Sequence, residues 1–144
     1  MIDQLLKLLT LRWFIFLSGL LHLCQIPAIY FAPKMLNWKA ELAKLTPINA
    51  RIYVVIGVAI TIVVIGLGIV VMSASAELAA GGRLAAGVMA FLAVFWAYRA
   101  AIQIFLYTNI WPGGWMGRLS HVGLALLLTY LAVSYAVFFV MALR

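Results

Sequence analysis

Acidic residues and cysteine are almost absent from this sequence of 144 residues. Its only carboxylates are Asp3, Glu41 and Glu77, and its only cysteine is Cys24. One cysteine can form neither an intrachain disulfide nor a thiolate metal cluster, so we expect Cys24 to be a packing residue. Three scattered carboxylates do not supply the pair used in glycoside hydrolysis or the set that holds a di-iron centre. No metal site is therefore predicted.

Charge of either sign is also scarce. Charged residues make up 9% of the chain and hydrophobic residues 68%, with a mean hydropathy of +1.19. Soluble domains have about 25% charged residues and about 45–50% apolar ones, so the composition predicts an all-α membrane protein. The ten Lys and Arg residues give a net charge of +7. In a membrane protein such an excess marks loops and lipid phosphate contacts, and no nucleic-acid partner is implied.

Four apolar stretches predict transmembrane helices, since a span needs about 20 residues. We place them in a single domain, residues 1–144, at about 13–31, 52–72, 84–107 and 119–141. Little chain remains for a dinucleotide-binding sheet or a phosphate loop. Pro27 predicts a kink in the first span. Basic residues divide four against five between the two sides, which leaves the orientation open.

The segment between the first two spans is too polar to cross a membrane. Met35, Trp38, Leu42 and Leu45 recur at helical spacing, and most of the charged residues fall elsewhere on the wheel. This pattern predicts an amphipathic interfacial helix at about 34–46; a solvated loop helix is the alternative. Three tryptophans are predicted interface anchors: Trp38, Trp111 and Trp115.

Small residues line two of the predicted spans. Gly57, Thr61 and Gly68 share one side of the second span, which permits close helix approach. In the third span, alanines form a smooth stripe at spacings of four, three and four residues, at Ala86, Ala90, Ala93 and Ala97. We interpret both as helix-packing faces.

A few polar side chains fall inside the predicted spans. Ser18, His22 and Gln25 are spaced along one helix face, and Trp96, Arg99 and Gln103 are spaced along another. At 1.5 Å per residue, Gln25 and Arg99 share a level, while Gln103 and His121 lie close enough in depth to meet. The spacing thus predicts a polar ladder rising from mid-membrane toward the 34–46 segment. Its candidate ligand-binding residues are Arg99, Gln103, His121, Gln25 and His22.

Among these residues, Arg99 is the one whose placement within the membrane costs the most free energy. An arginine at the centre of a membrane helix costs about 2.5–3.5 kcal/mol, and no predicted span carries an acid to offset it. One interpretation is that Arg99 snorkels to a lipid phosphate, bonds to Gln25, Gln103 or tyrosine oxygens, or meets Glu41 folded back from the loop. Another is a ligand such as a lipid headgroup, a quinone oxygen or a haem propionate. A third is the carboxylate of a partner subunit.

The two histidines raise the question of haem b. Two axial ligands must lie at nearly one depth, whereas His22 and His121 differ by about 13 Å on a rise of 1.5 Å per residue. A haem shared by both is therefore disfavoured, and each histidine is better interpreted as a hydrogen-bonded packing residue. Neither has the serine and carboxylate of a catalytic triad. We expect no cofactor, and a quinone or haem b remains the alternative.

Scattered residues carry one resemblance over most of the chain. It rests on His22, Pro27, Trp38, Glu41, Leu42, Lys44, Leu45, Pro47, Asn49, Arg51, Phe95, Trp96, Arg99, Gln103 and His121. With these residues the chain resembles an uncharacterised group of small bacterial four-helix membrane proteins. The resemblance implies the four-helix architecture and a bacterial inner membrane, and it implies no activity.

These patterns leave three functional hypotheses. The first is a non-catalytic membrane protein, an accessory subunit or a self-associating bundle, whose partners are lipids and other membrane subunits or itself. The second is a redox or lipid-modifying protein that binds a quinone, haem or anionic headgroup near Arg99. An uncoupled transporter or channel ranks last, because the polar ladder reaches only halfway across the membrane. Proton-coupled export is disfavoured, since it needs a carboxylate within the membrane.

Overall fold

The structure, a computed structural model, describes residues 2–143 apart from the side chain of Asp3, and this range consists of helices joined by short connections, without a strand. Its elements are α1 (Ile2–Leu23), α2 (Ile26–Met35), α3 (Trp38–Leu42), α4 (Pro47–Ser73), α5 (Ser75–Ala80), α6 (Arg83–Ala101), the π-helical turn η1 (Ile102–Leu106) and α7 (Gly114–Ala142). Four segments are long and apolar enough to cross a membrane: Gln4–Met35, Pro47–Ser73, Arg83–Leu106 and Gly114–Ala142. The predicted all-α membrane protein with four spans is confirmed.

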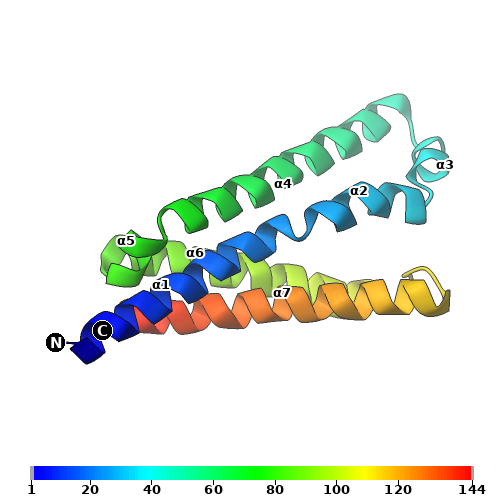
Figure 1. The fold of residues 1–144 in the computed structure, drawn as a ribbon. Coiled ribbons are helices and arrows are strands. Elements are labelled where there is room, and N and C mark those ends of the chain that lie inside the picture. Colours follow the sequence, from blue (N-terminus) through cyan, green and yellow to red (C-terminus); the bar gives the residue numbers. More distant parts are fainter. Residues whose placement is uncertain (1, 144) are drawn as a thin grey trace.

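The four spans alternate in direction (Figure 1). The first span and α6 therefore run parallel, and α4 and α7 run against them. The two ends of the chain lie together with α5 at one end of the molecule, and α3 lies at the other. The most extensive helix packing is between α6 and α7, followed by α1 against α4. Toward α3, α4 diverges from the α6–α7 pair (Figure 1).

The first span is broken into α1 and α2 at Cys24 and Gln25. Pro27 is the cause, because its nitrogen has no hydrogen to donate to Leu23 and its ring clashes with that carbonyl. The turn tightens locally, where the Gln25 amide donates to the His22 carbonyl at 3.2 Å. The kink predicted from Pro27 is confirmed. Cys24 lies exposed at this break, so its prediction as a packing residue was wrong.

The segment predicted as one helix over 34–46 is shorter and divided. Residues 34 and 35 belong to α2, and only the five residues of α3 are helical beyond them. Asn37 interrupts the helix with a left-handed backbone, φ 51°, which short amide side chains tolerate better than most. Thr46 is extended, as a residue before proline prefers.

The helices also extend past the predicted spans. The first reaches Gln4, and the fourth begins at Gly114 rather than near 119. The first helix continues through a leucine-rich stretch that also holds Lys7 and Arg12, whose long side chains can reach the membrane surface. The loop expected after Ser73 contains α5, whose Ser75, Leu78 and Ala79 are buried.

Two glycines allow α1 and α4 to cross closely. A Cβ added to Gly68 would lie 2.8 Å from the Cβ of His22 and 3.0 Å from the carbonyl oxygen of Gly19. A Cβ added to Gly19 would meet the carbonyl oxygen of Gly68 at 3.0 Å. The small-residue face predicted on the second span is thus used at Gly68. It is open at Gly57, where an added Cβ has no neighbour within 4 Å, because α4 has diverged there.

The alanine stripe of α6 is not its main packing face. Ala86 is buried, but Ala97 at the other end of the stripe is exposed. The buried line instead runs through Ala85, Met89, Leu92 and Trp96 and continues to Gln103. The two lines are one residue apart, which is about 100° around a helix. The stripe thus packs inside the chain at Ala86 and Ala93, while Trp96 and Gln103, whose polar atoms need partners, turn the adjacent line toward the protein.

We predict that Gly68→Leu destabilises the protein by about 1–3 kcal/mol, the usual cost of overpacking a tight contact. Thermal unfolding in detergent, followed by circular dichroism, measures the change. Gly66→Leu is the matched control, since an added Cβ at Gly66 meets nothing within 4 Å. Equal stability of the two variants would contradict the close crossing.

Candidate functional site

His22 is the centre of a buried hydrogen-bonded cluster. Its side chain is fully buried at the end of α1, as are Trp96 on α6 and Tyr135 on α7. The Trp96 Nε1 hydrogen is donated to His22 Nε2 at 3.1 Å, and the Tyr135 hydroxyl lies 2.9 Å from the same nitrogen. Three helices are therefore joined at one imidazole, which we call the His22 hub (His22, Trp96 and Tyr135).

These bonds determine the protonation of the His22 ring. An indole N–H only donates, so Nε2 accepts and the neutral ring carries its hydrogen on Nδ1. The Tyr135 hydroxyl must then donate to Nε2 as well, and the two donors share one lone pair. Nδ1 faces the Val64 carbonyl on α4 without a hydrogen bond of good geometry. Nε2 has no lone pair left for a metal or haem iron.

A second polar group lies toward α3, where Gln103 is buried against His121. Gln103 Nε2 is 2.8 Å from His121 Nδ1, which confirms the expectation that these residues meet. Gln103 belongs to η1, where the Tyr107 amide bonds five residues back to the Ile102 carbonyl. A π-helical turn adds a residue to the helix and re-aims its side chains. The sequence did not predict this turn.

The bonds around His121 form a directed chain. The Gln103 amide nitrogen donates to Nδ1, so the neutral ring of His121 carries its hydrogen on Nε2. Nε2 lies 3.3 Å from the Thr108 hydroxyl oxygen, and that hydroxyl donates in turn to the Ile104 carbonyl. Both ring nitrogens of His121 are thus occupied. His121 therefore stabilises the turn between α6 and α7.

Gln25 and Arg99 each have a buried nitrogen without a partner, as His22 has at Nδ1. Gln25 is 5% exposed, yet its Nε2 has no hydrogen-bond acceptor. Arg99 is half-buried, and its Nε is also buried without an acceptor. An unsatisfied buried polar group costs about 1–3 kcal/mol, and more if it is charged. Two such donors, one at the break between α1 and α2 and one on α6, mark the part of the polar ladder that we consider open to a ligand.

The hypothesis that Glu41 offsets the charge of Arg99 was wrong. Glu41 is exposed and pairs with Lys44 in the next turn, with the Lys44 Nζ 2.7 Å from Oε1. That contact forms the one ion pair among the side chains that the structure describes, which exclude Asp3. The expected bonds from Arg99 to Gln25, Gln103 or tyrosine oxygens are also absent from these described side chains. The guanidinium thus has no anion among the described side chains.

The structure places the two histidines on separate levels. His22 bonds to Trp96, and His121 bonds to Gln103, seven residues further along the same span. Seven residues correspond to about 10 Å along a helix, too far for two ligands of one iron. The described residues also contain no cluster of three or more His, Cys, Asp or Glu side chains that could hold a metal ion.

The three tryptophans expected to anchor the protein differ in their contacts. Trp111 is half-buried, and its Nε1 donates to the Ser120 hydroxyl on α7 at 3.1 Å. Trp38 packs edge-on against Tyr53 of α4, with ring centroids 5.2 Å apart. Trp115 is 75% exposed and is free to contact lipid. Anchoring at the membrane surface thus fits Trp115 best.

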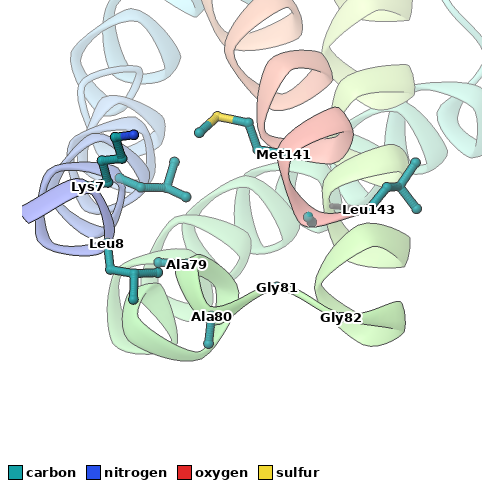
Figure 2. Close-up of a pocket in the computed structure, with 10 residues that line it drawn as sticks. Lys7, Leu8, Ala79, Ala80, Gly81, Gly82, Met141 and Leu143 are labelled. Atoms are coloured by element: carbon teal, nitrogen blue, oxygen red, sulfur yellow. The ribbon is translucent and has the colours of Figure 1, made fainter. Parts of the chain in front are cut away.

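A cavity of about 570 Å³ lies between the first turns of α1, the Gly81–Gly82 connection and the end of α7 (Figure 2). Lys7, Gly81, Gly82 and Met141 are among its lining residues. Gly81 and Gly82 form the strap between α5 and α6, and the Gly82 amide donates to the Ala142 carbonyl at 3.2 Å. The lining contains none of the predicted site residues and a single charged group, so we assign it no chemistry.

Tyr135 and Thr108 are the site residues that the sequence analysis missed. A tyrosine within a span, away from the membrane surface, must find a partner for its hydroxyl, and this was a usable signal. Thr108 carried no such signal, because it lies in a polar connection after the third span.

We predict that Tyr135→Phe lowers the free energy of unfolding by about 0.5–1.5 kcal/mol, the net value of one hydrogen bond. Denaturation by a graded detergent mixture measures it. The control is Tyr130→Phe, on the same helix but 46% exposed, which should change little. Trp96→Phe is then made in the wild type and in Tyr135→Phe. The two losses of stability should not add, since Trp96 and Tyr135 donate to the same nitrogen; additive losses would contradict a shared acceptor.

The candidate ligand residues thus fall into three groups: His22 in the hub, Gln103 with His121 in the turn, and Gln25 with Arg99 unsatisfied between them. Comparison with known proteins found no matching family model, curated protein or solved structure.

Proposed function

We propose that this protein is a non-catalytic integral membrane protein of the bacterial inner membrane that associates with a second copy or another membrane subunit and binds lipid. The observation that carries the proposal is a set of glycines within the spans that lack any neighbour. A Cβ added to these glycines would meet nothing within 4 Å: Gly57, Gly66, Gly87 and Gly123.

Glycine has a cost in a helix that packing must offset. It is about 1 kcal/mol worse than alanine in a helix interior, and lipid tails gain nothing from its small size. Small residues in membrane helices serve chiefly to let two helices approach closely. Gly19 and Gly68 do this within the chain. The open glycines are suited to the same role toward a helix from outside it.

The first half of α4 offers the longest such surface. None of its residues from Pro47 to Val63 is buried, because α4 diverges from the other spans toward α3 (Figure 1). Its smoothest side carries Ala50, Gly57 and Thr61, which are half-buried. A neighbouring helix could pack there at close range, and this supports an accessory or self-associating role.

The polar groups support a role without catalysis. The buried Ser18 hydroxyl donates to the Phe14 carbonyl at 2.9 Å, and neither histidine has a carboxylate beside it among the described residues. Each polar ring nitrogen except His22 Nδ1 is held in a structural bond. These bonded groups hold helices together, which supports a structural role for them.

The α3 segment supports a position at the membrane surface. Lys39, Glu41 and Lys44 are exposed, whereas Trp38 and Leu42 are half-buried. Such a short two-faced segment suits the boundary between headgroups and acyl chains. In this proposal α3, Trp38 and Trp115 set the depth of the α3 end of the bundle.

The second candidate function, binding of a quinone, haem or anionic headgroup near Arg99, is favoured by one observation. The unsatisfied nitrogens of Gln25 and Arg99 require acceptor atoms. Haem b fits this site poorly, since the lone pairs of both histidines are occupied. The headgroup is compatible with the first proposal and the redox cofactors are not.

We predict that Gly57→Leu and Gly87→Leu each weaken self-association about tenfold, since a clash of roughly 1.4 kcal/mol corresponds to that factor. Native mass spectrometry from mild detergent gives the oligomeric state. Val133→Leu, at an exposed position of α7 without glycine, is the control. A wild-type protein that is monomeric and retains neither lipid nor another protein would overturn the proposal.

We also predict that the purified protein shows no Soret band and yields no extractable quinone. Both histidines lack a free lone pair for iron, and the charge of Arg99 favours an anion over a neutral quinone. The optical spectrum and an organic extract measure this directly. A Soret band lost in His22→Leu would instead establish the redox function.

A further inference from the structure

We propose that Gln25 and Arg99 together bind the oxyanion of a phosphate group, in the first place that of an anionic phospholipid. This inference rests on the lipid-binding part of the proposed function and names its site. It begins from the two unsatisfied nitrogens, Gln25 Nε2 and Arg99 Nε, both buried and both without an acceptor.

The two side chains lie at one level of the bundle. Gln25 is three residues beyond His22, and Arg99 is three residues beyond Trp96. His22 and Trp96 are hydrogen-bonded to each other, and the two spans run parallel (Figure 1). Both residues therefore lie about one helical turn, roughly 4.5 Å, above the His22 hub, in the direction of α3.

The surrounding polar groups do not serve as acceptors for them. Below, Nε2 of His22 is shared by Trp96 and Tyr135. Above, Gln103 and His121 are bonded to each other, and His121 is closed on its other side by Thr108. The acceptor nitrogens of both histidines are thus occupied, and His22 Nδ1, which is buried without a partner, carries a hydrogen and cannot accept. The acceptor that this level lacks must come from a molecule outside the chain.

The charge of Arg99 narrows the chemistry of that molecule. The only ion pair among the described side chains is Lys44 with Glu41, so none of those side chains supplies a counter-charge to the guanidinium. A neutral acceptor such as water or a ketone would satisfy the hydrogen bonds but leave a cation in a low-dielectric site. A phosphate oxyanion supplies several acceptor oxygens and the negative charge, and guanidinium groups match its geometry well.

The position of the site favours a lipid as the source of the phosphate. Arg99 lies seven residues before Leu106, the end of its span, about 10 Å along the helix. No residue of α2 is buried and the first half of α4 is exposed, so the chain that follows Gln25, itself 5% exposed, faces the surrounding bilayer. A lipid can enter from that side without leaving the membrane, with its headgroup drawn toward Arg99.

The test uses the full chain in maltoside micelles with phosphatidylglycerol as the probe, and native mass spectrometry gives the affinity. We expect one phosphatidylglycerol to bind more tightly than phosphatidylcholine. Arg99→Gln should weaken its binding about 10- to 100-fold, the range for a hydrogen bond to a charged group. Gln25→Leu should weaken it less, by about threefold to tenfold. Arg118→Gln, which removes an exposed arginine at the start of α7, is the charge-matched control.

Inorganic phosphate distinguishes the two sources of the oxyanion. Displacement of the lipid by millimolar phosphate would support the site and assign it to a free anion, and resistance to phosphate would assign it to the lipid. Equal affinities of Arg99→Gln and Arg118→Gln would overturn the proposal. A wild-type protein that binds neither probe would also overturn it, because the nitrogens would then be hydrated.

Two further variants keep the test independent of folding and of the association proposal. Arg99→Lys keeps the charge but has no Nε donor, so it should fold and still show weaker lipid binding; binding equal to the wild type would count against the site. Oligomeric state is measured in the same spectra. If wild-type protein associates but binds no phosphatidylglycerol, this site fails while the proposed association stands. If it binds the lipid but is monomeric, the association fails while the site stands.

Discussion

The structure depends on the need to satisfy one buried imidazole where water is absent. His22 lies in the membrane interior, and its Nε2 accepts hydrogens from Trp96 and Tyr135. An unsatisfied polar group in hydrocarbon costs several kcal/mol, so the helices that carry these donors must keep their mutual register. The hub therefore fixes the positions of α1, α6 and α7 relative to one another along their axes. As a result, Gln25 and Arg99 are held at the same level, and Gln103 is held opposite His121.

Two local features divide the molecule into a tight half and an open half. At the end with the termini, Gly19 and Gly68 bring α1 and α4 into backbone contact, and α5 packs beside them. At the α3 end, Pro27 breaks the first span, and α4 diverges (Figure 1). The polar residues without partners lie at the boundary between these halves. A rigid support next to an accessible surface is an arrangement that suits lipid binding.

The sequence predicted the inward face of the first span well and that of the third less well. Ser18, His22 and Gln25 are all buried, because polar groups at helical spacing have only one direction in which to avoid lipid. The alanines of α6 did not identify its main buried face, since small residues suit close packing equally well inside a chain and between chains. The meeting of Gln103 with His121 followed from depth alone, whereas the π-helical turn that aims Gln103 left no sign in the residue pattern.

The sequence by itself determined the features that depend on residues close together in the chain. These are the four spans, the kink at Pro27, and a line of polar residues without a carboxylate. Hydropathy and helical period are local, so these features could be read directly. Only the tertiary structure decided which partners meet. Trp96 lies 74 residues from His22, and Tyr135 lies 113 residues from it. Such pairs depend on how helices rotate and slide against each other, and that is set by the packing of the whole bundle. The same packing left the Nε of Arg99 buried without an acceptor.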